Sequence, residues 1–555
     1  MSHAVSRIVV GVVRVAAPLL APLLVLLLVA APGALAAKAG SGGGWPASKD
    51  IQHLHFEYGP IDVKPGQNTI ENAVLTQAQK PKVDGYIIRA RPDLQYMDGT
   101  VPKVDVIHLH HGVWINITGK SLASPFGTFE PIFFGGEEKT IFQIPRGYGY
   151  AYKASDTWVL NHMIHNNTPN RTKVKLVWDL DFVPATTALA KTVKPVKPLW
   201  MDVRRGWGYP VFDVLRGTGS GGTYNFPDQA KTNPYADGTI QNEFKLPFSG
   251  TLVSAVGHLH PGGLRDDIDL VRPGATPTRA ASCRMEATNA AWTATRRACV
   301  TAKAGSVGNS VRIFRSQATY YEPAGPVSWD VSLTASRPDW RVKVNSGDTL
   351  RITSVYENKR SAWYESMGIV LLFMAPNDTS GTDPFAKAVD WRGVLTHGHL
   401  AENSHHGGDI KTFADARKLP DGPATTQVTI KGFQFLPGDL GINSGGKGSV
   451  PTVTAGQPLQ FVNEDDPNYE WHSITACAAP CSYSTGIAYP LANGLPGQQF
   501  DSGQLGFGFA GLTPATNTLS WQTPTTLPIG TYTYFCRIHA FMRGAFRVKP
   551  APPPA

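Results

Sequence analysis

Short alternating or apolar segments, bounded by turn-forming residues, dominate the hydrophobic pattern of the chain. Examples are TKVKLVWDLDFV (172–183), DTLRITSVY (348–356) and TQVTIKGFQF (426–435). Alternation with a period of two places apolar side chains on one face of a strand, and helical spacing is nearly absent. The 56 glycines and 44 prolines supply turns at short intervals. The pattern therefore predicts an all-β protein built from β-sandwiches.

The domain organisation follows from length and from changes in composition. A chain of 555 residues exceeds what one hydrophobic core can serve, so length alone favours about three domains. A small-residue and lysine segment near residue 190 is typical of a connector, and the chain turns polar after the apolar segment GIVLLFMAP. The predicted units are a signal peptide (1–36), two sandwiches (48–190 and 195–376), a linker (377–425) and a last domain (426–549).

The first residues have the composition of an export signal. Arg7 and Arg14 precede an apolar run, which ends in small residues typical of a cleavage site. We expect cleavage after Ala36 and therefore a secreted, extracytoplasmic protein. The apolar run is short for a membrane span and contains two prolines, so we expect no membrane span after signal cleavage.

Charge and cysteine content narrow the functional classes. The formal net charge is +9, and the excess of Lys and Arg is spread without a cluster, which indicates a solvated basic surface and no nucleic-acid partner. The five cysteines divide into Cys283 with Cys299, Cys477 with Cys481, and a single Cys536. An unpaired surface thiol is a liability outside the cell, so Cys536 is expected to bind a metal.

The segment GTYTYFCRIHAFM (530–542) contains the most specific motif of the chain. It places Cys536, His539 and Met542 at spacings of three, and His472 lies upstream in DDPNYEWHSITAC. A thiolate, two imidazoles and a weak axial thioether suit copper that cycles between two oxidation states. The alternative, a buried cysteine with histidines nearby, explains the β context and the upstream histidine less well.

This last unit resembles the plastocyanin and azurin type of cupredoxin over its whole length. The resemblance implies a Greek-key domain with one type 1 copper, held by His472, Cys536, His539 and Met542. Multicopper oxidases also contain such domains, but they flank the cysteine with histidines. Here Phe535 and Arg537 flank Cys536, so that electron relay is missing.

The remaining histidines concentrate in three motifs: VIHLHHGVW, WVLNHMIHNN and VSAVGHLHPGG. Two histidines separated by one residue on a strand point to the same face. Adjacent histidines point apart on a regular strand, so the pair in the first motif predicts a bend or a bulge. Three such motifs in β segments favour metal binding over satisfied core histidines.

Residues 48–376 resemble the copper type II, ascorbate-dependent monooxygenases, the peptidylglycine α-hydroxylating and dopamine β-monooxygenases. The resemblance rests on these motifs and their order, and it implies two tandem jelly-roll-like sandwiches with one mononuclear, type 2-like copper each. An electron-transfer copper is implied at His110, His111 and His165. A catalytic, O₂-binding copper is implied at His258, His260 and Met367. The alternative for Met367 is an ordinary core methionine.

Departures from that family bear on the substrate. Val256, Ile369 and Leu371 occupy positions where the amidating enzyme holds its peptide substrate with Arg and polar side chains. A peptide ending in glycine is therefore not expected, and a neutral or apolar small molecule fits better.

Several histidines have no assigned role at this stage, and structural or ligand-orienting roles are preferred for them. They are His53, His55, His108 and His162 in the sandwiches, and His397, His399, His405 and His406 in the linker. A further copper site in the linker is the alternative for the last four.

The sequence thus predicts a secreted copper monooxygenase that uses O₂ to hydroxylate a C–H bond of an unknown small molecule. Electrons from an external reductant or redox protein are expected to pass from Cys536 to the copper of the first sandwich. The alternative from another class is a non-catalytic copper-binding electron carrier or copper scavenger.

Overall fold

The computed structural model describes residues 44–551, all within one unit (40–555), with gaps. The gaps are 105, 120–128, 204–210, 215–216, 228, 230–241, 276–282, 286–298, 302–308, 322–325, 327–328, 360–362, 401–413, 442–447, 466–469, 478, 480, 482–499, 507–517 and 540. Only the backbone is described at 213, 283–285, 299–301, 364–365 and 504. The predicted signal peptide, His405 and His406 lie outside the described residues, and so do the side chains of Cys283 and Cys299.

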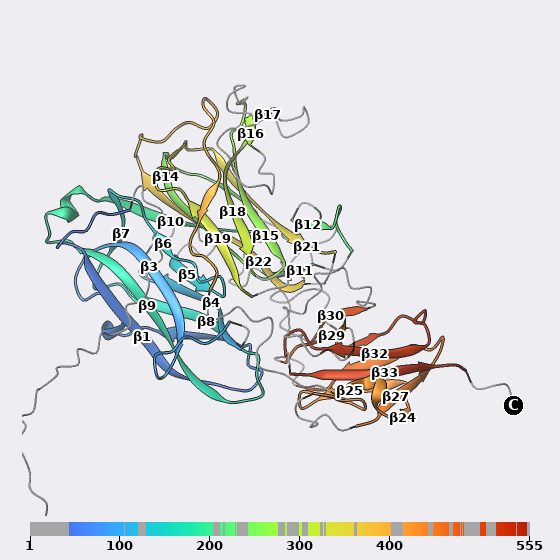
Figure 1. Cartoon of the computed structure of the whole chain (residues 1–555). Helices are drawn as coiled ribbons and strands as arrows, with labels where there is room; N and C mark the ends of the chain where they lie inside the picture. Colours follow the sequence, from blue (N-terminus) through green and yellow to red (C-terminus); the bar gives the residue numbers. More distant parts are fainter. Residues whose placement is uncertain are drawn as a thin grey trace, which may run out of the picture. The chain divides into compact units, whose positions relative to one another are not determined.

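Strand β9 (Thr172–Pro184) shows how alternation in the sequence produces the sheet. Val174, Leu176 and Trp178 are fully buried, while the residues between Trp178 and Val183 alternate between core and surface. Such alternation buries one face of an antiparallel sheet against the core and leaves the other face polar. Strand β9 pairs with β1 on one side and β3 on the other, and Figure 1 shows these three strands side by side.

The polar face of β9 accounts for two of the unassigned histidines. His53 lies opposite Asp181 in the register of β1 and β9, and its Nδ1 is 2.6 Å from the carboxylate. His55 lies opposite Asp179 with its Nδ1 at 2.8 Å. These cross-strand pairs give both histidines a structural role on an exposed face.

The first sandwich has a four-stranded sheet in the order β2–β8–β4–β5, facing the strands around β9. Its elements are β1 (Gln52–Val63), β2 (Ile70–Val74), η1 (Gln77–Gln79), β3 (Gly85–Tyr96), β4 (Ile107–Asn116), β5 (Glu130–Gly136), β6 (Phe142–Gln143), β7 (Tyr148–Tyr152), β8 (Trp158–Asn166) and β9. Trp114 stacks on Phe133 and meets Trp178 edge-on, and these buried rings fill this part of the core.

The second sandwich begins at β10, directly after the 3-10 turn η2 (Leu189–Thr192), where the sequence predicts a connector. Its elements are β10 (Lys194–Asp202), β11 (Val211–Val214), β12 (Thr223–Phe226), β13 (Glu243–Lys245), β14 (Gly250–Leu259), β15 (Gly263–Val271), β16 (Cys283–Met285), β17 (Cys299–Thr301), β18 (Ser310–Tyr320), β19 (Val331–Ser336), β20 (Val342–Val344), β21 (Thr349–Glu357), β22 (Trp363–Pro376) and β23 (Gly393–Leu395). Because β10 pairs with both β7 and β22, hydrogen bonding runs continuously from one sandwich into the next.

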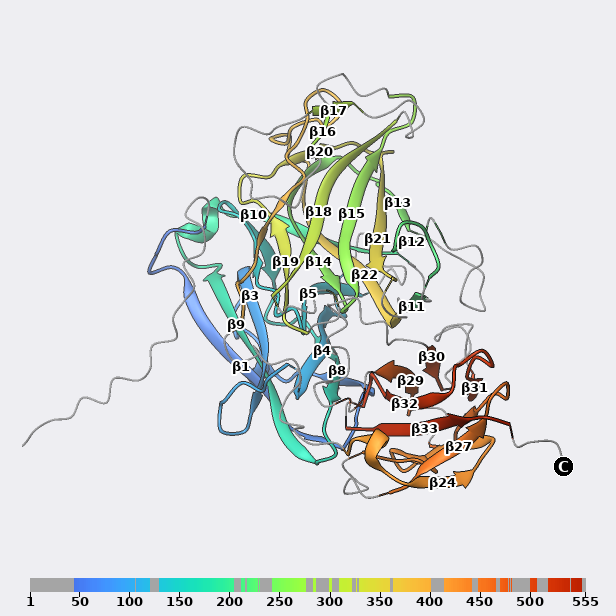
Figure 2. The ribbon, with the colours of Figure 1, turned by 45° about the vertical axis from the view of Figure 1, so that its right-hand side comes forward.

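The C-terminal domain contains two sheets, in the orders β24–β27–β33–β32–β29–β30 and β26–β25–β28–β31 (Figure 2). Its elements are η5 (Ala416–Lys418), β24 (Asp421–Ala424), β25 (Gln427–Lys431), β26 (Gln434–Leu436), β27 (Val450–Thr454), β28 (Gln460–Asn463), β29 (His472–Cys477), β30 (Asp501–Leu505), β31 (Ser520–Gln522), β32 (Gly530–Phe535) and β33 (Arg543–Lys549). The disulfide predicted between Cys477 and Cys481 is confirmed, and Cys536 is a free, buried thiol.

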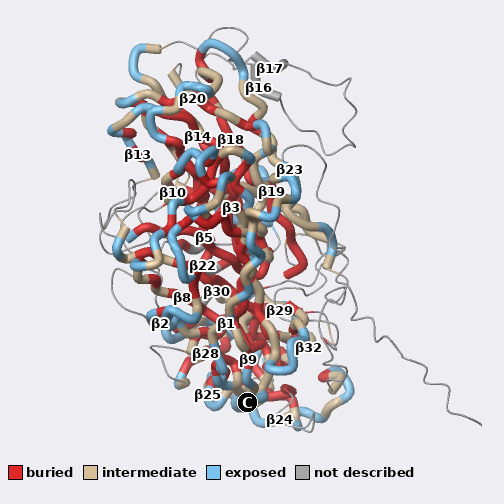
Figure 3. The backbone as a smooth tube through the Cα atoms, turned by 90° about the vertical axis from the view of Figure 1, so that its left-hand side faces the viewer, coloured by how far each residue is buried: buried red, intermediate tan, exposed pale blue. Residues whose placement is uncertain are grey.

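The prediction of an all-β protein is confirmed, since the described residues contain strands and 3-10 turns but no α-helix. One apolar core extends through the first two sandwiches and includes Cys477, Cys481 and Phe535 of the C-terminal domain, and a second core fills the rest of that domain. Figure 3 shows this buried interior in red along the strands. No helix in the described part of the chain is long and apolar enough to cross a membrane.

Candidate metal centres

The first candidate centre lies in the C-terminal domain, where β29 and the loop after β32 meet. Cys536 Sγ is 3.9 Å from His472 Nδ1 and 3.7 Å from His539 Nδ1, and the two nitrogens are 3.1 Å apart. All three side chains are completely buried, and their donor atoms could hold one metal ion. We call this group, His472–Cys536–His539, the thiolate centre.

Local hydrogen bonds explain why the thiolate centre takes this form. The backbone N–H groups of Ser473 and His539 each donate to Cys536 Sγ at 3.4 Å. The far nitrogen of His472, Nε2, is 2.9 Å from the carboxylate of Asp465. Because Nε2 is bound to Asp465, Nδ1 is left to face the sulfur. A partner on one ring nitrogen usually orients the other nitrogen of a metal-binding histidine in this way.

The charges at the thiolate centre favour a metal. Burial alone would raise the pKa of Cys536, but hydrogen bonds and charge from His472 and His539 lower that pKa well below its ordinary value. Burial alone would lower the pKa of His472, whereas Asp465 and Cys536 raise it to about 9. The site therefore prepares a thiolate, which is the form of cysteine that binds metals.

Met542, the predicted axial ligand, lies in the same loop and is completely buried. Its backbone N–H donates to His539 O at 2.9 Å, and its carbonyl accepts from Cys536 N–H at 3.3 Å. The loop thus closes on itself between Cys536 and Met542. The structure brings the donor atoms of His472, Cys536 and His539 together and places Met542 in the same loop. A thiolate with two imidazoles and a thioether fits copper.

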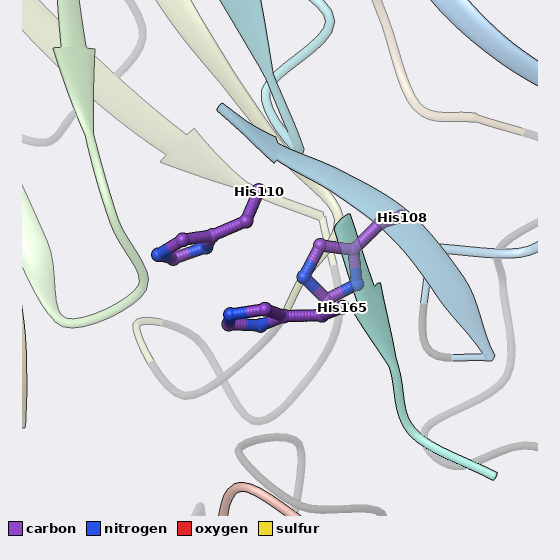
Figure 4. A group of neighbouring side chains, drawn as sticks. All are labelled: His108, His110 and His165. Carbon is purple, nitrogen blue, oxygen red and sulfur yellow. The ribbon is translucent and has the colours of Figure 1, made fainter. Parts of the chain in front are cut away.

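The second candidate centre lies in the first sandwich and consists of His108, His110 and His165 (Figure 4). The rings of His110 and His165 are stacked, with centroids 4.0 Å apart and planes within 14°. The ring of His108 meets that of His165 edge-on at 5.0 Å. All three residues are buried, and each offers a nitrogen within reach of one metal ion. We call this group the histidine centre.

A β-bulge decides which histidines meet. His108 lies directly opposite His165 in the register of β4 and β8, but the register shifts between Leu109 and His111, so His110 is the extra residue. The bend predicted from adjacent histidines is therefore present. A bulge re-aims side chains locally, and His110, at this bulge, offers a ligand atom to the same group as His108 and His165.

Several nitrogens of these histidines are buried without a partner among the described residues. His108 donates through Nδ1 to Val104 O at 2.5 Å, and neither its Nε2 nor His165 Nε2 has a hydrogen-bond partner among the described residues. His110 Nδ1 lies 3.5 Å from Glu137 Oε2. Burial and the neighbouring histidines hold the pKa values of His110 and His165 well below the ordinary value. Buried, neutral imidazoles with free nitrogens are ready metal ligands.

Two histidines of the second sandwich are oriented by acids of the first. His260 Nδ1 is 2.9 Å from Glu137 Oε1, and His258 Nδ1 is 2.9 Å from Glu138 Oε1. The Nε2 atoms of both histidines are buried without a partner in the described part of the chain. A carboxylate on one ring nitrogen fixes the tautomer and leaves the other nitrogen for a metal.

The histidine centre continues into the second sandwich through His260. Its ring stacks on that of His110 with centroids 3.8 Å apart, and His110, Glu137 and His260 also offer atoms within reach of one ion. His110 belongs to both groups. The donors of two sandwiches therefore converge on one place.

Glu137 and Glu138 are completely buried, and Oε2 of each lacks a hydrogen-bond partner among the described residues, although Glu137 Oε2 lies 3.5 Å from His110 Nδ1. Burial and the charge of Glu138 raise the pKa of Glu137 well above its ordinary value. The adjacent cation, Lys139, is paired with Asp93 instead. Buried carboxylates need compensation by charge, and a metal cation held by these imidazoles would supply it. The sequence analysis did not identify either acid, because two adjacent glutamates after an apolar strand do not form a recognisable metal-ligand motif.

The remaining predicted ligands lie near these groups. Burial, His258 and His162 lower the pKa of His111 to about 3, so His111 lies beside them and outside the group of His108, His110 and His165. Met367 is buried within β22 and pairs with Val211 of β11. The hydroxyl of Tyr356 accepts from the backbone N–H of His260 at 3.2 Å and donates to the carbonyl of Met367 at 2.6 Å, so Met367 and His260 lie near each other.

The described linker histidines have other partners. His397 Nε2 is 2.5 Å from Glu138 O, and His399 Nδ1 is 2.6 Å from Asp330. Neither belongs to a group with metal-ligand geometry in the part of the chain that the structure describes. His162 is buried, and neither of its ring nitrogens has a partner among the described residues.

Comparisons with known proteins give a limited result. No protein family and no curated protein matches the chain. Among solved structures, it is similar to a purple cupredoxin from Nitrosopumilus maritimus, with 14% identity, 22% of this chain and 100% of that chain covered, and a TM-score of 0.14. Auracyanin A from Chloroflexus aurantiacus has 22% identity, 23% and 100% coverage and a TM-score of 0.15.

The chain is also similar to a copper-containing nitrite reductase from Thermus scotoductus, with 14% identity and a TM-score of 0.15. The match covers 54% of this chain and 55% of that chain. Likeness at these scores carries no argument, and the description of the chain as β-sandwiches followed by a C-terminal domain of two sheets rests on its own strands.

Proposed function

We propose that this chain is a secreted copper redox protein with two kinds of copper centre. The thiolate centre would hold a type 1 copper that carries single electrons. The histidine centre would hold the second, with nitrogen ligands from His108, His110, His165 and, across the sandwiches, His260. Copper bound there would supply redox chemistry with O₂.

The convergence of Cys536 Sγ with His472 Nδ1 and His539 Nδ1 in a fully buried site is the observation that carries the proposal. A lowered thiol pKa and N–H donors to the sulfur support a permanent thiolate. Thiolate with two imidazoles selects copper in electron-transfer sites. An electron carrier fused to a second metal-binding region implies that the two work together.

The finer proposal is an O₂-dependent monooxygenase that hydroxylates a C–H bond. The histidine motifs support it by their order along the chain, and the buried Val256, Ile369 and Leu371 support a neutral or apolar small substrate. Such a reaction consumes O₂, two electrons and two protons, and releases one water with the hydroxylated product. The electrons would come from an external reductant or redox protein.

A second candidate, a non-catalytic electron carrier or copper scavenger, is favoured by a different observation. His108, His110, His258 and His260 are each no more than 5% exposed. A centre so closed to solvent suits electron transfer, because such transfer needs no substrate at the metal.

The test separates these functions in two stages. Copper content per chain, visible absorption and electron paramagnetic resonance of the copper-loaded protein would establish the thiolate centre and the number of further coppers. O₂ uptake with a reductant would then be measured across a panel of apolar compounds. Uptake that depends on substrate and yields a hydroxylated product supports the monooxygenase, and bound copper with no such uptake supports the carrier.

Export is part of the same proposal. The leader-like first residues and the Cys477–Cys481 disulfide support an oxidising compartment. Sequencing the mature N-terminus after expression in a secreting host should place the first residue at Ala37.

A further inference from the structure

A ligand of the thiolate centre contacts the backbone of the first sandwich. His539 Nε2 is 3.0 Å from the carbonyl oxygen of Gly66, in a buried contact between residues far apart in the sequence. Because Nδ1 of the same ring faces Cys536 Sγ, Nε2 carries the hydrogen and donates it to Gly66.

The shape of the loop at Gly66 fits this contact closely. Gly66 has a φ of +63°, in the left-handed region that favours glycine. A Cβ atom there would lie 2.6 Å from Phe433 Cε1 and 3.0 Å from His539 Cδ2. Phe433 in turn packs its ring against that of His539, with centroids 4.9 Å apart. Only a residue without a side chain allows the two surfaces to approach so closely.

The same loop is hydrogen-bonded to the histidine centre at its other end. Gln67 O accepts the backbone N–H of Asn166 at 3.0 Å, and Asn166 directly follows His165. Gly66 N–H also donates to Thr168 O at 3.1 Å, which fastens the loop to the end of β8. Gly66, Gln67, His165 and Asn166 are all buried.

We propose that the Gly66–Gln67 loop is the bridge for electron transfer between the two centres. The path runs from His539 through the Gly66 carbonyl and the Gln67 peptide to Asn166 N–H, and from there to His165. Electronic coupling falls off more slowly through covalent and hydrogen bonds than across a van der Waals gap, and this path contains no such gap.

This inference rests on the proposed function, since both centres must hold copper. One electron moves: copper(I) at the thiolate centre is oxidised to copper(II), and copper(II) at the histidine centre is reduced to copper(I). No bond is made or broken, and the proton on His539 Nε2 stays in place. Phe535 and Arg537 flank Cys536, so the chain lacks an electron relay through histidines beside the cysteine. The Gly66–Gln67 path offers another connection between the two centres.

The substitution that tests the bridge is Gly66→Ala. The added methyl group meets Phe433 and His539 and forces the carbonyl away from Nε2. Gly99→Ala is the matched control, because Gly99 also has a positive φ, +87°, in the first sandwich, but a Cβ there meets nothing within 4 Å. Both variants bear the same kind of backbone strain, and only one affects the bridge.

The first readout does not depend on electron transfer. In the diamagnetic copper(I) protein, the Nε2 proton of His539 should give an NMR signal that exchanges slowly with solvent in the wild type and in Gly99→Ala, and rapidly in Gly66→Ala. Rapid exchange in the wild type would mean that the hydrogen bond to Gly66 does not exist, and would overturn the inference without any variant.

The second readout is the rate at which the thiolate centre, reduced by a radical pulse, regains its visible absorption as the electron leaves. We expect recovery several-fold slower in Gly66→Ala than in Gly99→Ala. The double variant Gly66→Ala with Phe433→Ala gives the Cβ room and should recover part of the rate, which a general folding defect would not allow. Equal rates in both glycine variants, although the Nε2 proton exchanges rapidly in Gly66→Ala, would overturn the bridge alone.

Copper content distinguishes failure of the bridge from failure of the proposed function. Wild-type protein that binds copper only at the thiolate centre would refute the proposed function, and the bridge with it. If both centres of the wild-type protein bind copper but Gly66→Ala does not change the rate of electron transfer between them, the bridge is refuted and the proposed function is not.

Discussion

The thiolate centre and the histidine centre differ in how their ligands are distributed along the chain. Cys536, His539 and Met542 share one loop, and β29, which provides His472, pairs directly with β32 before that loop. The histidine centre draws on β4, β8 and, through His260, the end of β14 in the second sandwich. One centre is therefore a property of a loop, whereas the other depends on strand register and on the contact between two sandwiches.

The two centres also orient their histidines by different means. In the thiolate centre, the carboxylate of Asp465 and the carbonyl of Gly66 hold the Nε2 atoms and leave Nδ1 for the metal. In the histidine centre, Val104 O and Glu137 hold the Nδ1 atoms and leave Nε2 free. Each centre thus depends on partners that spacing in the sequence does not reveal.

The largest expected effect separates the two centres completely. Cys536→Ser should abolish the intense visible absorption, because only a thiolate gives strong charge transfer to copper(II). Copper at the histidine centre should remain, since its ligands lie in other domains. Absorption spectra and copper content of the purified variant test this. Simultaneous loss of the remaining copper would show that the centres are not independent.

The next effect decides which neighbour of His110 is a ligand. His108→Asn should lower copper affinity at the histidine centre by more than about 100-fold, the upper end for residues that only orient ligands. His111→Asn, the matched control on the same strand, should leave most of that affinity. Competition with a copper chelator measures both. If His111→Asn caused the larger loss, the ligand set implied by the monooxygenase resemblance would be favoured.

The difference between the centres explains what the sequence could predict. The all-β fold followed from alternation such as that of β9, and the thiolate centre followed from one loop and one upstream histidine. The sequence analysis assigned no ligand role to His108, although His108 and His110 have the same spacing as His258 and His260. The resemblance directed attention to His110 and His111, and the pairing of His108 with His165 appears only in the register of β4 and β8.

Other parts of the site left no signal in the sequence. Glu137 and Glu138 follow an apolar strand, and nothing in their spacing indicates that they bond to histidines more than a hundred residues away. Gly66 is one glycine among 56. Its importance comes from the approach of Phe433 and His539, which depends on tertiary contacts and not on local pattern.

A smaller effect is expected from the histidines of the second sandwich. His260→Asn removes a ring that stacks on His110. His258→Asn is the control, because His258 also bonds to a buried carboxylate but belongs to no group with metal-ligand geometry among the described residues. We expect a clear loss of copper affinity at the histidine centre for His260→Asn and little change for His258→Asn. Equal losses would indicate a separate copper site that uses both, as the sequence first predicted.

The orienting acids should give a weaker version of the same contrast. Glu137→Gln keeps the size of the side chain but removes the charge that holds His260 Nδ1–H, and about a 10- to 100-fold loss of copper affinity is typical for such partners. Glu138→Gln serves as the control, since its histidine is His258. Titration of each apoprotein with copper measures the difference, and indistinguishable affinities would remove Glu137 from the centre.

The smallest effect concerns Met367, a predicted thioether ligand that is also packed in the apolar core. Met367→Leu conserves volume, so the stability of the second sandwich should fall by less than about 1.5 kcal/mol. Since the Tyr356 hydroxyl joins the backbones of His260 and Met367, loss of a sulfur ligand should weaken copper(I) several-fold while sparing copper(II), because a thioether prefers the softer ion. Thermal unfolding controls for packing, and copper(I) titration measures the ligand. An unchanged copper(I) affinity together with unchanged stability would make Met367 a core residue, and would confine thioether chemistry in this chain to the loop of Met542.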